Sequence, residues 1–419
     1  MESLLIFIFI IIFISILTIR FHVTPFLTLI AAAFIFGILN GMTEWLVQYV
    51  TGGAGRIFSL LGIPIYCGAV IAQILRHGHF IERIVDDVKR AIKAPDMAAG
   101  VVGYLLSIPL MCCLTAYVVM LPLIEQMEKE HSSNGRLFYM AAFGSVLSFV
   151  LILPLPVVYS MTTTFSVPAS ESFSINLITV PLSIFLLGIG YVVSKRLSRG
   201  QQHPVPELEG LVEPVMISLP RWKVWLPIAL PVLLITIGYL FSPLSAISDV
   251  NIALVISVFA SLLLVSEGPR RLALEKGTKN AGIILFDLCG AGALGFVISA
   301  SSFPDEVFTL ISAILPVVVI PFALAVLIQT AQGSRVVTAV ITATILAGTD
   351  IVASIPTIPL ILMISAGTLV VSYVSDPYFW LIQRSTGDSI PTVVRRFTLP
   401  LAGAGILIFC CSMVIFLLG

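Results

Sequence analysis

The stretch "QTAQGSRVVTAVITAT" (329–344) places polar and helix-breaking residues inside an apolar part of the chain. Gly333 and Ser334 interrupt the apolar pattern, and Thr338 and Thr342 stand four residues apart, on one helix face. Backbone groups freed by a break inside a membrane must be satisfied by protein or face a water-filled cavity. The stretch therefore predicts a broken membrane helix beside a cavity, an arrangement typical of secondary transporters.

The composition of the chain is that of a membrane protein. Of its 419 residues, 58% are hydrophobic and 11% are charged, and the mean hydropathy is +1.10. Soluble domains carry about 25% charged residues. Apolar spans that could cross roughly 30 Å of hydrocarbon recur along the chain, so we expect an all-α polytopic membrane protein with about 11–13 transmembrane segments in a lipid bilayer. The net charge of zero gives no indication of a nucleic acid as partner.

The loops indicate how the chain lies in the membrane. The first apolar segment, 3–19, lacks a basic start and a cleavage site, so we expect a retained transmembrane helix. Most Lys and Arg lie in the loops 76–97, 195–223, 266–280 and 381–397, and none lie in 161–173, 243–250 and 301–306. The positive-inside rule places the first group in the cytoplasm and both termini outside, in a multi-pass protein of the cell membrane.

Two parts of the chain resemble each other. The small-residue-rich segments "GRIFSLLGIPIYCGAVIAQIL" (55–75) and "AGIILFDLCGAGALGFVISA" (281–300) each precede an interrupted apolar stretch, at 98–124 and 331–347 respectively. By the charge rule, the first segment runs inward and the second runs outward. We therefore expect an inverted repeat with broken or re-entrant helices, because transporters of this kind bind substrate between two such repeats.

A matched spacing follows in both repeats. Gly144 stands ten residues before Pro154, and Gly367 stands ten residues before Pro377. Because proline lacks the backbone N–H that a helix interior needs, Pro154, the neighbouring Pro156 and Pro377 are the expected helix breaks.

We expect five parts along the chain. These are N-terminal transmembrane helices (1–56), a first repeat (57–194), a cytoplasmic linker (195–223), connecting helices (224–280) and a second repeat (281–419). The linker is assigned from its polar sequence, rich in Pro and Glu, which differs from both flanks.

The break at Gly333 has the features of an anion site. Arg335 follows it with a fixed positive charge and donors suited to a carboxylate. A helix that starts there would add N–H groups and the positive end of its dipole. The hydroxyls of Ser334, Thr338 and Thr342 would then bind a small organic anion. Two structural alternatives stay open: Arg335 can extend to the lipid headgroups, and the threonines can bond to their own helix.

Asp287 stands inside the otherwise uncharged segment 281–300. A carboxyl group within the membrane is a candidate proton carrier, because desolvation favours its neutral form. The alternative is a structural aspartate that caps a helix or pairs within the bundle.

Other motifs give no sign of a cofactor or a metal. "CGAGALG" (289–295) matches a dinucleotide-binding pattern, but close helix packing explains its small residues. His77 and His79 lack metal-ligand spacing, and their segment 76–96 is interpreted as an amphipathic interfacial helix. We expect no metal, no cofactor and no enzymatic activity. An integral membrane enzyme acting on lipid-linked substrates and a passive channel are the alternative classes of function.

Four motifs together resemble the gluconate permease family, proton-coupled symporters of the ion transporter superfamily. They are "IRFHVTPFLTLIAAAFIFGILNGM" (19–42), "VVMLPL" (118–123), "AVLIQTAQGSRVVTAVITA" (325–343) and "SYVSDPYFWL" (372–381). Their order and spacing cover nearly the whole chain. The resemblance implies an inverted-repeat transporter with hairpins, which takes up sugar acids or related hydroxy carboxylates with protons.

The resemblance also transfers roles to individual positions. Gly333, Ser334, Ser375, Asp376 and Pro377 match or adjoin the motif positions of the family. Asp376 is therefore expected to handle the proton or to order the substrate site, with Asp376 and Ser375 counted among the binding residues.

The chain departs from the family pattern at several places. Ser375 stands where the family has Asn, Tyr373 replaces a histidine, and Leu114, next to the candidate Thr115, replaces an acidic residue. Arg335 is not typical of the family. We expect a proton-coupled importer of a small organic anion. Alternatives are another small carboxylate or an amino acid with a different coupling ion, and a homo-oligomer stays open.

Overall fold

The computed structural model describes residues 2–21, 23–131, 135–197, 220–240, 246–303, 306, 315–373 and 376–418, and every regular element in them is helical. The helices are, in chain order, α1 (Glu2–Ile19), α2 (Pro25–Leu39), α3 (Leu46–His77), α4 (Phe80–Ala91), α5 (Pro95–Leu110), α6 (Cys113–His131), α7 (Arg136–Leu151), α8 (Pro156–Thr164), α9 (Ala169–Leu197), α10 (Arg221–Leu240), α11 (Val250–Leu262), α12 (Glu267–Ser299), η2 (Val317–Val319), α14 (Ile320–Gln332), α15 (Arg335–Ala347), α16 (Ile351–Ser354), α17 (Thr357–Val370), α18 (Pro377–Thr386), α19 (Ile390–Val393), η3 (Val394–Thr398) and α20 (Leu399–Leu418). Most of the expected linker 195–223 lies outside the described residues.

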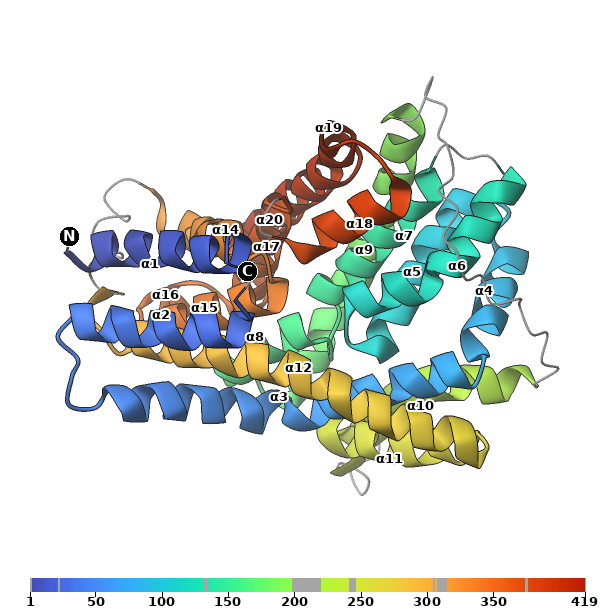
Figure 1. Ribbon diagram of the computed structural model, residues 1–419, viewed down its shortest axis with the longest axis horizontal. Helices are drawn as coiled ribbons and strands as arrows, with labels where there is room; N and C mark the ends of the chain where they lie inside the picture. Colours follow the sequence, from blue (N-terminus) through green and yellow to red (C-terminus); the bar gives the residue numbers. More distant parts are fainter. Residues whose placement is uncertain are drawn as a thin grey trace.

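Figure 1 shows two groups of helices connected along one side of the molecule. α2, α3 and α12 run beside one another, and α12 contacts both of the others. α5, α6, α7 and α9 pack together towards one end, whereas α14, α15, α17 and α20 pack together nearer the other. We call these the first and the second bundle. Each bundle contains one of the two interrupted stretches.

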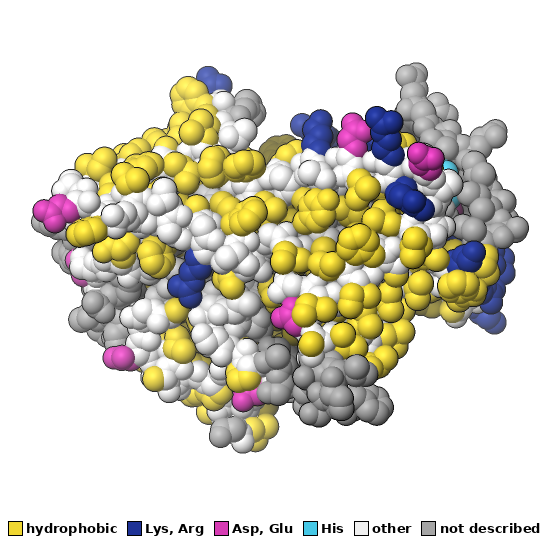
Figure 2. Space-filling view, turned by 90° about the horizontal axis from the view of Figure 1, so that it is seen from below, with side chains coloured by type: hydrophobic (Ala, Val, Ile, Leu, Met, Phe, Trp, Pro, Cys, Tyr) yellow, Lys and Arg dark blue, Asp and Glu magenta, His cyan; other side chains and the backbone are white. Residues whose placement is uncertain are grey.

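The chain is a multi-pass membrane protein. Six helical spans in the described part are long and apolar enough to cross a membrane, namely Leu46–His77, Arg136–Thr164, Ser174–Leu197, Arg221–Gly238, Glu267–Ser299 and Ile390–Leu418. Large hydrophobic side chains such as Phe58, Phe259 and Phe286 are exposed. Figure 2 shows such side chains spread over one face, with most of its Lys and Arg towards the right-hand end. An apolar exterior of this kind suits lipid rather than water.

α3 and α12 approach closely because glycines face each other. A Cβ on Gly53 would lie 2.5 Å from the carbonyl oxygen of Gly292, and one on Gly292 would lie 2.6 Å from that of Gly53. Small residues allow membrane helices this approach. The expected loop 266–280 is wrong, because α12 already begins at Glu267 and continues without a break. The expected boundary 280/281 therefore falls inside α12, and the expected boundary 56/57 falls inside α3.

Each interrupted stretch contains a short turn between two helices: 98–124 covers most of α5 and α6, and 331–347 covers the end of α14 and all of α15. α5 contacts α6 and α14 contacts α15, so each pair turns back as a hairpin. The turns contain Met111 and Gly333 in the left-handed conformation, with φ of 50° and 68°. Glycine adopts this conformation without steric cost, which explains why only the second turn is evident from sequence.

The helix after each hairpin is also broken. Residues 152–155 separate α7 from α8, and Pro154 lies in this break while Pro156 begins α8. α17 ends at Val370, and Pro377 begins α18. All three prolines therefore lie where the sequence predicts interruptions.

Side chains of the following helices satisfy the backbone at these breaks. Asn176 of α9 accepts from the N–H of Leu153 and donates to its carbonyl oxygen, both at 2.9 Å. Thr398, just before α20, donates to the carbonyl oxygen of Ser372 at 2.5 Å. Backbone freed inside a membrane needs such partners.

Equivalent helices pack against each other in the two bundles. α7 packs on α5 where Gly144 meets Gly100, and α17 packs on α14 where Gly367 meets Phe322. α9 then packs on α7, and α20 packs on α17. A structural repeat requires such equivalence. The opposite orientation of the two repeats stays a prediction.

Substitution of Gly144 by alanine is expected to destabilise the first bundle. The new Cβ would lie 2.0 Å from the carbonyl oxygen of Gly100, a backbone atom that moves only with its helix. Overpacking costs about 1–3 kcal/mol, so Gly144→Ala should lower the melting temperature of the purified protein. Gly188→Ala is the control, because its Cβ would meet no atom within 4 Å. An equal fall in melting temperature in Gly144→Ala and Gly188→Ala would contradict this packing.

Candidate substrate site

A buried ion pair lies where the second hairpin meets the break after α17. Arg335, the first residue of α15, donates from Nη2 to Asp376 Oδ2 at 2.9 Å and to Ser372 Oγ at 3.0 Å. The Ser372 hydroxyl also donates to Asp376 Oδ2. Arg335 is 4% exposed and Asp376 is 1% exposed. Arg335 therefore does not extend to the lipid headgroups.

The start of α18 holds the other oxygen of Asp376. Pro377 opens this helix with a backbone angle that suits its first position. Asp376 is the N-cap, and its Oδ1 accepts the N–H of Tyr378 at 2.9 Å. A carboxylate in this place also lies at the positive end of the helix dipole. Both oxygens are thus bonded, one by the helix and one by Arg335 and Ser372.

A pair of charges inside a membrane protein indicates function more than stability. Replacing such a pair by apolar residues is often neutral, whereas removing one partner costs about 3–5 kcal/mol. Ionisable groups within membrane segments commonly mark substrate or proton pathways. Arg335 Nε is buried and has no hydrogen-bond partner in the described structure. The guanidinium therefore keeps a donor for a further acceptor.

Other predicted residues lie along the same hairpin. Gly333 and Ser334 form its turn, and Ser334 is half-buried, without a side-chain bond to the helix it caps. Thr338 donates from Oγ1 to Gln329 Oε1 at 2.8 Å, across the hairpin rather than to its own helix. Thr342 is fully buried, and its Oγ1 has no partner among the described residues.

The turn of the first hairpin reaches the same place. Cys113, the first residue of α6, lies close enough to Arg335 and Asp376 for their charges to act on its thiol. Tyr117, further along α6, contacts the ring of Tyr378 edge to face, with centroids 5.4 Å apart. The first turns of α6, α15 and α18 therefore converge on the ion pair. This convergence connects the two bundles.

Hydroxyl groups link α18 to the first bundle. Tyr117 Oη bonds Ser385 Oγ at 2.7 Å, and Tyr378 Oη bonds Ser145 Oγ at 2.7 Å. Thr115, the candidate from the first interrupted stretch, is half-buried in the first turn of α6. It is near Cys113 in sequence, but no described hydrogen bond connects its side chain to the ion pair.

A second buried ion pair holds the far end of α18. Asp388 Oδ2 accepts the hydroxyl of Tyr139 at 2.5 Å and lies 3.9 Å from Arg396 Nη1. Arg396 belongs to the π-helix η3, and its guanidinium lies over the Tyr139 ring. α18 is therefore fixed at both ends by charged groups from other elements.

Sequence reasoning missed Ser372 and Gln329. Ser372 stands four residues before Asp376, and Gln329 stands four residues before Gly333. Both are fully buried and bond to predicted site residues. A polar residue four positions before a predicted site residue is the signal that could have found them.

Two predicted residues are not joined to this cluster. Asp287 of α12 is half-buried, and its Oδ1 accepts the N–H of Phe26 at 3.2 Å, at the start of α2. No described contact connects it to Arg335 or Asp376. Asp287 thus occupies the structural position of a helix cap, and its part in proton coupling stays a prediction. Ser375 lies outside the described residues.

The amide variant Asp287→Asn separates the two interpretations of Asp287. Its carbonyl can still accept the Phe26 N–H, so a capping role leaves pH-driven uptake by the reconstituted protein close to that of the wild type. Asp287→Leu removes the acceptor and should lower stability by about 1 kcal/mol. If Asp287→Asn keeps substrate exchange but loses the response to a pH gradient, Asp287 carries the proton.

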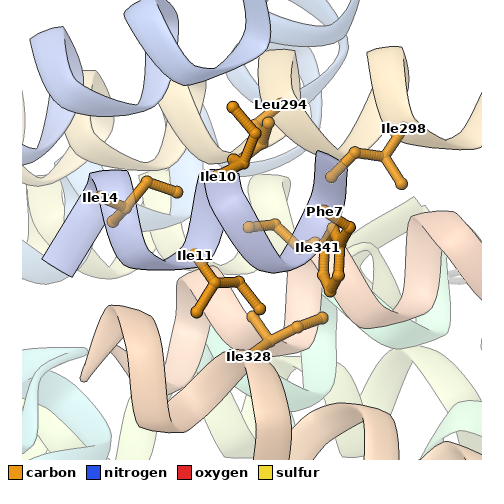
Figure 3. A pocket seen from close by; sticks show the side chains of 8 residues that line it. All are labelled: Phe7, Ile10, Ile11, Ile14, Leu294, Ile298, Ile328 and Ile341. Carbon is orange, nitrogen blue, oxygen red and sulfur yellow. The ribbon is translucent and has the colours of Figure 1, made fainter. Parts of the chain in front are cut away.

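An apolar pocket beside the second hairpin does not suit an anion. Figure 3 shows it between α1, α12 and the second hairpin. Its lining consists of apolar side chains, namely Phe7, Ile10, Ile11, Ile14, Leu294, Ile298, Ile328 and Ile341. The described residues also contain no group of three or more His, Cys, Asp or Glu side chains placed to hold a metal.

Comparisons with known proteins agree with the resemblance in the sequence. The chain is 23% identical to the high-affinity gluconate transporter of Escherichia coli over 93% of each chain. It is 24% identical to the gluconate permease of Pseudomonas aeruginosa over 90% of each chain. It is 26% identical to an uncharacterized permease of Haemophilus influenzae, covering 92% of this chain and 85% of that protein.

A solved structure shares the fold. The YdaH transporter of Alcanivorax borkumensis matches with a TM-score of 0.59 and 15% identity, over 90% of this chain and 88% of that one. The fold is thus an all-helical, multi-span transporter fold. The family model described as GntP family permease matches residues 2–418. The chain therefore belongs to the GntP family of permeases.

Proposed function

We propose that this permease is a secondary active transporter, which takes up a small organic anion such as gluconate or a related sugar acid together with protons. The buried Arg335–Asp376 pair between broken helices is the observation that carries the proposal. The names of two relatives, a gluconate transporter and a gluconate permease, support the substrate class.

The ion pair suggests how proton and substrate are coupled. A proton that binds Asp376 Oδ2 neutralises the carboxylate and leaves Arg335 without its counter-ion. The carboxylate of a substrate then takes that place on the guanidinium, which can bond a carboxylate through two nitrogens. Arg335 Nε, buried and without a partner among the described residues, offers one of these donors.

The charges of this exchange balance. Before it, the site holds Arg335⁺ and Asp376⁻; afterwards it holds Arg335⁺, neutral Asp376 and one substrate carboxylate. One proton and one monoanion therefore enter together, and the site stays neutral in both states. A half-loaded site, which holds the proton or the anion alone, would leave an unpaired charge in a membrane protein, which is costly. This cost suppresses movement of either species alone.

Reconstitution tests the proposal. Purified protein in liposomes that contain unlabelled gluconate should accumulate labelled gluconate by counterflow, and an inward proton gradient should drive net uptake. Flux that ignores the proton gradient would favour a passive channel or another coupling ion. If neither gluconate nor any related sugar acid exchanges, the proposed substrate class is wrong.

A further inference from the structure

Gln329 has an unusual set of bonds for a fully buried residue. It lies in the last turn of α14, four residues before the left-handed Gly333. Its Oε1 accepts the Thr338 hydroxyl at 2.8 Å, whereas its Nε2 is buried without a partner in the described structure. An amide nitrogen carries two donors. Because buried donors are nearly always bonded, this one indicates a partner supplied from outside the chain.

Further buried atoms without partners lie close by on the same hairpin. Arg335, Thr338 and Thr342 stand at positions i, i+3 and i+7 of α15 and so share one face of the helix. The bond between Thr338 and Gln329 places the amide beside the middle of this face. Arg335 Nε at one end and Thr342 Oγ1 at the other are both buried and without described partners. The row therefore offers a charged donor, an amide donor and a hydroxyl in sequence.

This row matches the chemistry of a carboxylate that carries hydroxyl groups on its chain. The guanidinium suits the carboxylate, while neutral donors and hydroxyls suit the hydroxyl oxygens without adding charge. The Thr338 hydroxyl holds Oε1, so the amide is oriented with its nitrogen away from that bond. The first hairpin has a similar feature, because Ser107, four residues before Met111, is also buried and its hydroxyl has no partner in the described part of the chain.

We infer that Gln329 is a specificity-determining residue, whose amide nitrogen donates to a hydroxyl oxygen of the substrate while Arg335 binds the carboxylate. Thr342 completes the row. This inference rests on the proposed function and adds to it the residue that distinguishes hydroxy acids from the corresponding deoxy acids. A site that bonds a substrate hydroxyl disfavours the analogue without it, because its own polar group is then left unpaired.

Competition in proteoliposomes tests the inference. Gluconate and its monodeoxy analogues each compete with counterflow of labelled gluconate, and the half-inhibitory concentrations are compared. With wild-type protein, the half-inhibitory concentration of at least one analogue should exceed that of gluconate by about tenfold or more. Gln329→Met should remove most of that difference and leave competition by the analogue itself nearly unchanged. Gln329→Glu should strongly weaken the binding of gluconate, because a carboxylate at this position cannot donate a hydrogen bond and repels the anion.

The control is Gln73→Met, the same change at a buried glutamine of α3 whose Oε1 also has no described partner. It should retain the wild-type order of analogues. If Gln329→Met exchanges too slowly, shifts in melting temperature with each analogue give the same comparison. If Gln329→Met distinguishes gluconate from the deoxy analogues as well as the wild type does, whatever the stability of the variant, the role of Gln329 is overturned and the proposed function is not. Absence of exchange by wild-type protein with any sugar acid overturns the proposed function as well.

Discussion

Replacing Arg335 by alanine is expected to abolish uptake and to lower thermal stability together. The change leaves Asp376, which is 1% exposed, without its counter-ion. Removing one partner of a buried pair lowers the free energy of unfolding by about 3–5 kcal/mol. The substrate carboxylate also loses its positively charged partner, which should weaken binding by about 100-fold or more. Gluconate counterflow and melting temperature of the purified variant measure both effects.

A double variant separates function from stability. Arg335→Met with Asp376→Leu removes both charges and keeps apolar volume, so stability should return towards that of the wild type. Uptake should remain absent, because no positive charge is left for the substrate. Uptake by the stable double variant would show that the ion pair is only structural. Arg335→Lys keeps the charge but lacks the planar fork, so it should retain weak binding only.

Asp376→Asn is expected to uncouple transport from protons. The single amide oxygen can keep the N-cap bond from the Tyr378 N–H, whereas the amide nitrogen replaces Oδ2 and no longer accepts from Arg335. The variant carries no titratable group at this position and resembles the protonated state. Counterflow of gluconate should therefore persist, while accumulation driven by an inward proton gradient should disappear.

The control for this variant is Asp388→Asn. It makes the same change in the second buried ion pair, at the opposite end of α18. That pair holds the helix without contact to Arg335 among the described interactions, so gradient-driven uptake should be retained at reduced stability. Loss of coupling in Asp388→Asn but not in Asp376→Asn would move the proton site to the far end of α18.

Local sequence signals predicted the break that matters most. Gly333 followed by Ser334 and Arg335 indicated the second hairpin, because a glycine and two polar residues in succession interrupt the apolar run locally. The first hairpin turns at Met111, a residue without such a signal, and only its stretch 98–124 was predicted. The prolines likewise predicted both later breaks.

The partner of Arg335 could not be predicted in the same way. Its ion pair joins residues 41 positions apart, and no local pattern indicates which acid will face a given arginine. Asp287 and Asp376 were both proton-coupling candidates from the sequence, and only the packing of α17 and α15 brings Asp376 to Arg335. The position of Asp287 at the start of α2 depends equally on long-range packing.

The charged start of α12 shows another limit of sequence patterns. Segment 266–280 carries several Lys, Arg and Glu residues and was predicted to be a loop from its charge. It is helical because a long helix can continue beyond the apolar layer, where its charged side chains are solvated. Charge indicates which part of the chain faces water, but it does not indicate where a helix ends.

Proton movement caused by substrate tests the central claim most directly. Proteoliposomes with equal pH on both sides and a fluorescent pH indicator inside receive gluconate outside. Wild-type protein should acidify the interior by one proton for each gluconate that enters. Asp376→Asn should cause no acidification, although that variant still exchanges gluconate. Gluconate entry by wild-type protein without a proton, or acidification by Asp376→Asn equal to that of wild type, would contradict it.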